Sequence, residues 1–232
     1  MPSIALIGPD GSGKTTVTRM LEASGILPFK YLYMGIEVTK SNVALPTSRL
    51  IARLVARSRK PGETGGAPPT EQPPNGRRGL GGRLWAYGRL TDRLLDEWFR
   101  QLVSWSYELR GHVVLYDRHF VFDFAPEVTA HADEPLDKRI HRWCLARFYP
   151  RPDLVIFLDA PAAVLLARKG ESTLAELERR RHAFLSVGAR TKAFVRVDAT
   201  RPLPDVYAEV VQHVLGACAR ARIHPRMPEV AR

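Results

Sequence analysis

Cysteine and long apolar runs are scarce in this chain. The two cysteines among its 232 residues, Cys144 and Cys218, lie far apart and match no metal-ligand spacing. Their scarcity argues against a disulfide framework and a zinc site, and it fits a reducing compartment. No apolar run reaches the ~18 to 20 residues that span a bilayer, and the first residues show no charged leader segment. We therefore expect a cytoplasmic protein without a membrane partner.

Acidic residues are also few, because 35 Lys and Arg residues outnumber 24 Asp and Glu residues and give a formal net charge of +11. A basic chain favours anionic partners, which include nucleic acid and small phosphates. The arginines are spread along the chain rather than gathered on one helix, so we expect most of them on a solvated surface. One core suffices for this length, and we predict a single domain over residues 1–220 with a basic tail at 221–232.

Short apolar runs alternate with segments of helical periodicity. The runs predict strands at 3–7, 29–34, 112–116, 154–158 and 193–199. The periodic segments predict helices at 14–24, 43–58, 83–110, 135–148, 161–168, 172–188 and 203–220. This alternation predicts an α/β fold, in which a parallel five-stranded sheet has helices on both faces. Residues 61–82 are rich in glycine and proline and poor in apolar side chains, so we expect a flexible loop there.

The segment GPDGSGKT at residues 8–15 matches the Walker A pattern G-x-x-x-x-G-K-[ST] in full. It lies between a predicted buried strand and a predicted helix, which is the context of a P-loop. Glycines let successive N–H groups converge on phosphate oxygens, and the helix adds the positive end of its dipole. Lys14 is then the cation for the β and γ phosphates, and the Thr15 hydroxyl is a ligand of Mg²⁺.

A P-loop needs an acid at the end of a neighbouring strand to help hold Mg²⁺. Asp117, which follows the strand HVVLY, is the expected acid. The guanidinium of Arg118 can grip phosphate oxygens bidentately, as phosphoryl transfer requires. His119 could orient Arg118 or fill space, and we assign it no catalytic role.

A second group of cations follows the strand at 154–158. It begins at Arg168 and Lys169, breaks at Gly170, and continues in a helix that carries Arg179, Arg180 and Arg181. A hinge followed by a basic helix is typical of a lid that closes over phosphates and excludes water. We therefore expect a basic lid over residues 160–188. A solvent-facing helix with Glu/Arg pairs is the alternative.

Four segments in this order resemble the thymidylate kinase family of P-loop nucleoside monophosphate kinases. They are GPDGSGKTT, VVLYDRH, PDLVIFLDAPAAVLLARKGE with the helix after it, and VDATRPLPDVYAEVV. The resemblance implies a P-loop NTPase fold with ATP and Mg²⁺ as cofactors. It further implies that Asp10 meets an acceptor sugar hydroxyl, that Arg118 contacts the acceptor phosphate, and that 198–202 flank adenine. Family members with glycine at the position of Gly11 draw an arginine from the lid, here chiefly Arg168.

Other positions depart from the family pattern. After Asp117 and Arg118 this chain continues HFVFDFAPE, where members that use thymidylate have serine and glutamine. An arginine-bearing motif after the second strand is replaced by YLYMGIEVT, and the arginine that usually reads the acceptor is out of register, although Arg89 and Arg93 lie nearby. The acceptor therefore stays open between a deoxynucleoside monophosphate such as dTMP and a nucleoside, sugar or other small hydroxyl compound.

These inferences together define the expected site. The expected catalytic residues are Lys14, Asp117, Arg118 and Arg168. The expected cofactor-binding residues are Gly8, Asp10, Gly11, Ser12, Gly13, Lys14, Thr15, Thr16, Arg168, Asp198, Ala199, Thr200, Arg201 and Pro202. The expected metal ligands are Thr15 and Asp117. A nucleotide-binding module that contacts nucleic acid is the alternative from another class, and a homodimer is left open.

Overall fold

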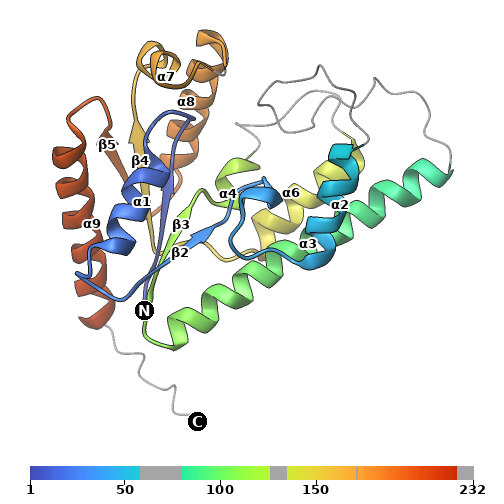
Figure 1. Ribbon diagram of the computed structural model, residues 1–232, viewed down its shortest axis with the longest axis horizontal. Coiled ribbons are helices and arrows are strands. Elements are labelled where there is room, and N and C mark those ends of the chain that lie inside the picture. The colour runs from blue at the N-terminus through green and yellow to red at the C-terminus, as the bar shows by residue number, and fades with distance from the viewer. Residues whose placement is uncertain (58–79, 126–134, 171, 224–232) are drawn as a thin grey trace.

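A computed structural model describes residues 1–57, 80–125, 135–170 and 172–223 (Figure 1). Its strands are β1 (Ser3–Ile7), β2 (Phe29–Tyr33), β3 (Val113–Asp117), β4 (Leu154–Asp159) and β5 (Phe194–Asp198). They form one sheet in the order β2-β3-β1-β4-β5, with every neighbouring pair parallel. The expected parallel five-stranded sheet is therefore confirmed, and the α/β arrangement is that of the P-loop NTPase fold.

Helices cover both faces of this sheet (Figure 1). They are α1 (Lys14–Ala23), α2 (Pro46–Arg57), α3 (Leu80–Leu109), α4 (Phe120–Asp123), α6 (Leu136–Phe148), α7 (Ala162–Lys169), α8 (Leu174–Gly188) and α9 (Leu203–Ile223), with a 3-10 turn η1 (Val38–Lys40). Because both faces are covered, the central strands β1, β3 and β4 are buried along their whole length, which explains their uninterrupted apolar runs.

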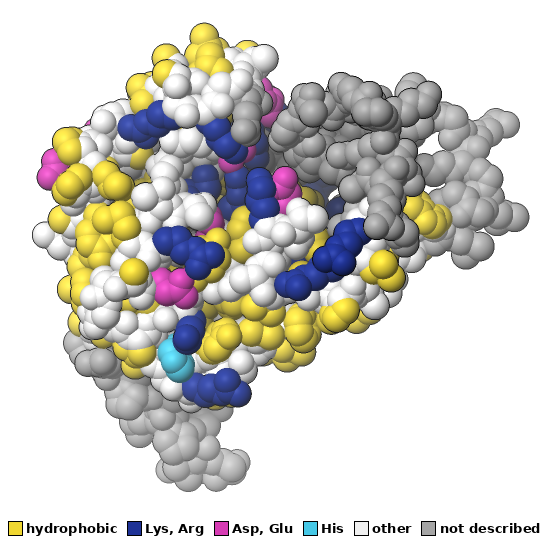
Figure 2. Space-filling model, in the orientation of Figure 1, with side chains coloured by type: hydrophobic (Ala, Val, Ile, Leu, Met, Phe, Trp, Pro, Cys, Tyr) yellow, Lys and Arg dark blue, Asp and Glu magenta, His cyan; other side chains and the backbone are white. Residues whose placement is uncertain are grey.

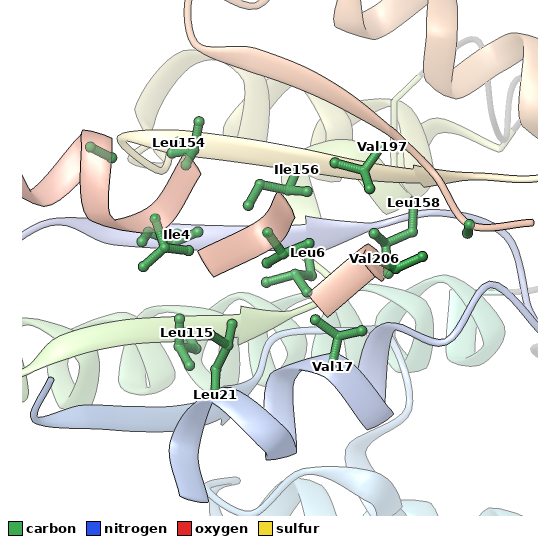
Figure 3. Packing of buried hydrophobic residues seen from close by; sticks show 14 of the residues in the cluster. Ile4, Leu6, Val17, Leu21, Leu115, Leu154, Ile156, Leu158, Val197 and Val206 are labelled. Carbon is green, nitrogen blue, oxygen red and sulfur yellow. The ribbon is translucent and has the colours of Figure 1, made fainter. Parts of the chain in front are cut away.

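The core has two layers, one on each side of the sheet. On one face, Val17 and Leu21 of α1 point toward Leu6 and Leu115, while Val206 of α9 lies near Leu158 of β4 (Figure 3). On the other face, the buried cluster also contains aromatic side chains, which include Phe120, Phe122, Phe157 and Phe184. Side chains of successive strand residues alternate between the two layers.

Several element boundaries differ from the expected ones. The helix α3 begins at Leu80, inside the segment expected as a loop at 61–82. A long helix tolerates glycines such as Gly81 and Gly82, each of which lowers helix stability by about 1 kcal/mol relative to alanine. The rest of that expected loop lies outside the described residues. The helix α9 runs to Ile223, past the expected start of the tail at 221, and the remainder of the tail is also outside the described residues.

Two short elements, η1 and α4, were not expected, because three or four residues are too few to show helical periodicity. Within the described ranges, no helix is long and apolar enough to cross a membrane. The division of the chain into one domain and a tail stays a prediction.

Candidate active site

The Walker A segment forms a tight loop between β1 and α1. Gly8 and Gly11 adopt positive φ angles of +150° and +86°, which L side chains rarely adopt. A Cβ atom at Gly8 would lie 2.7 Å from the carbonyl oxygen of Leu158, and one at Gly11 would lie 2.9 Å from that of Leu165. The loop is thus pressed against β4 and α7, and only glycine fits at these two positions.

Main-chain donors of this loop are available to a ligand. Within the described part of the chain, no hydrogen bond engages the N–H groups of Gly11, Gly13 or Lys14. A run of unpaired N–H groups at a helix N-terminus is an anion-binding arrangement. This geometry fits the phosphate cradle that the sequence predicts.

Lys14 is buried at the start of α1. Its Nζ donates to the carbonyl oxygen of Pro9 at 2.7 Å and to Ser12 Oγ at 3.3 Å. Burial, with help from Arg118, lowers the pKa of Lys14 to about 7, although Asp10 and other acids oppose the shift. An anion placed beside Nζ would favour the charged form.

Asp117 ends β3 at the edge of the sheet where the P-loop leaves β1. The parallel register pairs it with Leu6. Its Oδ2 accepts a hydrogen bond from Thr15 Oγ1 at 2.6 Å and another from the Tyr31 hydroxyl at 3.0 Å. Its Oδ1 is buried and has no partner among the described residues. The two expected metal ligands, Thr15 and Asp117, are therefore brought together.

Arg118 has a φ of +67°, an uncommon conformation for a residue other than glycine. Its main-chain N–H donates to the carbonyl oxygen of Leu6, and its side chain forms an ion pair with Asp10 of the P-loop. Strained backbone conformations of this kind cluster at functional sites. Gly35 makes room for the side chain, because a Cβ atom there would lie 2.6 Å from Arg118 Cδ.

Asp10 is surrounded by positive charge. Arg180 of α8 reaches to 3.7 Å of Asp10 Oδ2. Burial alone would raise the pKa of Asp10, but Arg118, Lys14 and Arg180 outweigh it and hold the pKa well below its usual range. Asp10 is therefore a stable anion at neutral pH. Figure 2 shows several Lys and Arg side chains spread over one face of the molecule, some of them beside Asp or Glu side chains.

Sequence reasoning missed Asp123, which lies at the end of α4. Its side chain is buried, and its Oδ2 has no hydrogen-bond partner among the described residues. Burial raises the pKa of Asp123, and the charges of Arg118, Arg180 and Lys14 oppose the rise. No sequence signal separates this aspartate from a surface one, because α4 is too short to show which face is buried.

The expected lid is a pair of helices joined at Gly170, whose φ is +68°. Arg168 is exposed at the end of α7, and among the described residues no hydrogen bond or ion pair joins it to the P-loop. Arg180 rather than Arg168 is the lid arginine that reaches Asp10. Arg181 instead pairs with Asp159 at 2.6 Å. Closure of this lid stays a prediction.

The segment at 198–202 follows β5, next to the end of β4. Asp198 lies opposite Asp159 in the β4–β5 register. It accepts hydrogen bonds from the Thr200 N–H and hydroxyl at 2.9 and 2.7 Å, and Arg201 pairs with Glu209. The segment is thus a structured turn at the same end of the sheet as the P-loop. The proximity of this turn to adenine stays a prediction.

His119 is buried among the rings of Tyr116, Phe122 and Tyr149. Within the described ranges, neither ring nitrogen has a hydrogen-bond partner. Burial, with a smaller effect of Arg151, lowers the pKa of His119 to about 3. It is a neutral packing residue here and does not touch the P-loop acids through a hydrogen bond.

The fold is that of the P-loop NTPases, and the unpaired N–H groups of the loop at its sheet edge fit the binding of an anion. No protein-family model matches the chain. The chain is similar to a protein named probable thymidylate kinase from Thermococcus onnurineus (strain NA1), with 29% identity over 216 residues that cover 90% of this chain and 94% of that relative. This modest similarity suggests the thymidylate kinase-like family, in agreement with the resemblance of the motifs.

Proposed function

We propose that this protein is an ATP- and Mg²⁺-dependent kinase that transfers the γ-phosphoryl group to a small acceptor, with a deoxynucleoside monophosphate such as dTMP as the leading acceptor. The similarity to a probable thymidylate kinase supports a nucleotide kinase. The observation that carries the proposal is the meeting of two distant segments: Thr15 of the P-loop donates to Asp117 at 2.6 Å, and Asp10 pairs with Arg118.

The residues present fit Mg²⁺. This ion commonly uses one or two protein oxygen ligands and completes its shell with phosphate oxygens and water. The Thr15 hydroxyl and the buried, unpartnered Oδ1 of Asp117 provide such ligands. Among the described residues there is no cluster of three or more His, Cys, Asp or Glu that could hold a metal alone. Bound Mg²⁺ supplies positive charge that stabilises the phosphates during transfer.

Catalysis in such a site is mainly positioning and charge stabilisation. In the proposed function, the free N–H groups of Gly11 and Gly13 donate hydrogen bonds to phosphate oxygens. Lys14 Nζ gives up its hydrogen bonds to Pro9 and Ser12 and donates to the same phosphate oxygens instead. Arg118 and Arg180 bring further positive charge. Arg168 joins them when the lid closes and excludes water.

Asp10 is the proposed partner of the acceptor hydroxyl, a role that requires it to release Arg118. A nucleoside, sugar or other small hydroxyl acceptor is the second candidate, and the acidic side chain of Asp123 near Arg118 is the observation that favours it. Asp10 is already paired with Arg118, the arginine that an acceptor phosphate would use, and Asp123 also interacts with Arg118 electrostatically. An acceptor with less negative charge than a monophosphate meets less repulsion there.

A coupled assay of ATP consumption tests the proposal across thymidylate, other nucleoside monophosphates, nucleosides and sugars. We expect thymidylate or another deoxynucleoside monophosphate to give the highest rate, and Lys14→Ala to abolish turnover while circular dichroism and melting temperature show an intact fold. Full activity in Lys14→Ala would contradict the kinase assignment. If thymidylate stays at background while a non-phosphorylated compound is turned over, the leading acceptor is wrong and the second candidate replaces it.

Two further parts of the proposal concern partners and location. We propose no stable nucleic-acid complex; nucleic-acid binding that falls steeply with salt would contradict this, because phosphate contacts release counterions. We also propose a cytoplasmic protein, which agrees with the finding that neither Cys144 nor Cys218 is in a disulfide. A homodimer stays an open proposal that sedimentation equilibrium can test.

A further inference from the structure

Tyr31 lies in the edge strand β2, where neither the sequence motifs nor the resemblance assigns a role. Its side chain is buried at 6% exposure. The β2–β3 register places Tyr33 opposite Asp117 and Tyr31 opposite Leu115. The Tyr31 side chain therefore reaches Asp117 diagonally along the sheet and donates its hydroxyl hydrogen to Oδ2 at 3.0 Å.

The two oxygens of Asp117 have unequal surroundings. Oδ2 accepts from both Thr15 Oγ1 and the Tyr31 hydroxyl, whereas Oδ1 is buried and has no partner within the described chain. An ionised carboxylate can accept at both oxygens. Because both donors bind the same oxygen, they restrict rotation of the Asp117 carboxylate. Oδ1 therefore remains available to another ligand.

Side chains of α1 hold Tyr31 in turn. Glu22 Oε1 accepts the main-chain N–H of Tyr31 at 3.1 Å, which satisfies a donor on the outer edge of the sheet. Arg19 pairs with Glu22 at 3.1 Å, and its guanidinium lies 3.7 Å from the centroid of the Tyr31 ring. Helix α1, which carries Thr15, thus also holds Tyr31 in place, and both residues donate hydrogen bonds to Asp117.

We propose that Tyr31 is a positioning residue for the divalent cation: together with Thr15 it holds Asp117 through Oδ2 and so directs Oδ1 to the cation or its bound water. The proposal deepens the proposed function and rests on its Mg²⁺ requirement. Groups that orient a metal ligand typically contribute 10- to 100-fold to metal affinity. The hydroxyl of Tyr31 is a group of this kind, since it touches the ligand and not the cation.

The test is binding of Mn²⁺, followed by electron paramagnetic resonance, to the full chain saturated with a non-hydrolysable ATP analogue. Turnover is not needed for this measurement. Tyr31→Phe removes the hydroxyl and keeps the ring under Arg19. We expect its Kd for Mn²⁺ to rise by about 10-fold or more, while its affinity for the analogue in the presence of EDTA and its melting temperature stay close to the wild-type values.

Two more variants complete the design. Tyr107→Phe is the matched control, because Tyr107 lies on α3 and its ring packs against His112 away from the P-loop; it should leave the Kd for Mn²⁺ unchanged. Arg19→Ala removes the exposed cation above the ring together with its ion pair to Glu22. A cation–π contact at an exposed site is worth about 0.5 to 1 kcal/mol, so we expect a rise in the Kd of about two- to five-fold.

A wild-type Kd for Mn²⁺ in Tyr31→Phe would overturn this proposal and leave the proposed kinase function standing. The same holds if affinity for the metal-free analogue falls as much as affinity for Mn²⁺, since the residue would then be merely structural. Absence of Mn²⁺ binding in the wild-type protein would overturn both this proposal and the Mg²⁺ requirement. If Tyr31→Phe does not fold, an unchanged Kd in Arg19→Ala overturns the proposal.

Discussion

We expect the side chain of Lys14 to take up a proton when a nucleotide binds. Burial and Arg118 lower the pKa of Lys14 to about 7 in the ligand-free protein. At pH 8 about nine-tenths of the Lys14 side chains are therefore neutral, and at pH 6 about one-tenth are neutral. Phosphate oxygens beside Nζ favour the charged ammonium and raise its pKa. Nucleotide binding should consequently be coupled to uptake of a proton by this side chain.

The expected magnitude follows from these fractions. Uptake approaches about 0.9 proton per nucleotide at pH 8 and falls to about 0.1 at pH 6. Isothermal titration calorimetry with a non-hydrolysable ATP analogue, repeated in buffers that differ in ionisation enthalpy, measures the proton count. The direction of the pH dependence also follows. The affinity for the nucleotide analogue should decrease as pH rises above about 7, because binding must then restore to Lys14 a proton that the free protein has lost.

Lys14→Ala separates this effect from other titrating groups. The variant should bind the analogue more weakly, and the uptake of the wild type minus that of the variant gives the contribution of Lys14, since the terminal phosphate of the analogue also titrates in this range. Asp10 does not contribute, because the neighbouring cations keep its pKa well below this range. The reasoning would be refuted if the difference in proton uptake between the wild type and Lys14→Ala were the same at pH 6 and pH 8.

Two predictions concern stability. The pKa of His119 is 6.5 in the unfolded chain and about 3 in the folded protein, so the unfolded state binds more protons between these pH values. The free energy of unfolding should therefore fall by about 2 kcal/mol, through this residue, when the pH is lowered from 7 to 5. Urea unfolding of the wild type and of His119→Phe should show that difference, and equal pH slopes would contradict it. Gly11→Ala and Gly25→Ala both introduce a side chain at positive φ, but only Gly11 has a neighbour, Leu165 O, at 2.9 Å. Gly25→Ala should cost about 1 to 2 kcal/mol and spare nucleotide binding, whereas Gly11→Ala should cost more and weaken binding; equal losses in calorimetry and unfolding would show that the contact with α7 is unimportant.

Local sequence determines the strands and the longer helices of this fold to within a few residues. The strands were predictable because each central one is buried on both faces and so reads as a short apolar run, as in β1. The cradle was equally predictable, since glycines followed by lysine and threonine between a strand and a helix carry their own geometry. Asp117 and Arg118 were identified because a strand end is also a local feature.

Contacts between distant segments were decided by tertiary structure alone. The hydrogen bond from Tyr31 to Asp117 spans 86 residues, and the ion pair between Asp10 and Arg118 spans 108. Such contacts depend on the order and register of three strands, which are set when the whole sheet packs against its helices. Periodicity within one segment shows which face is apolar but not which residue of another strand lies opposite.

The same limit applies to the lid and to Asp123. The sequence determines that a basic helix follows Gly170, and the tertiary structure decides that Arg180, rather than Arg168, reaches the P-loop. Asp123 is in a helix of four residues, too short for its buried side to be visible in the sequence. Local patterns thus determine the strands, the longer helices and the glycine-rich loop after β1, whereas the charges that surround this loop come from long-range packing of the folded chain.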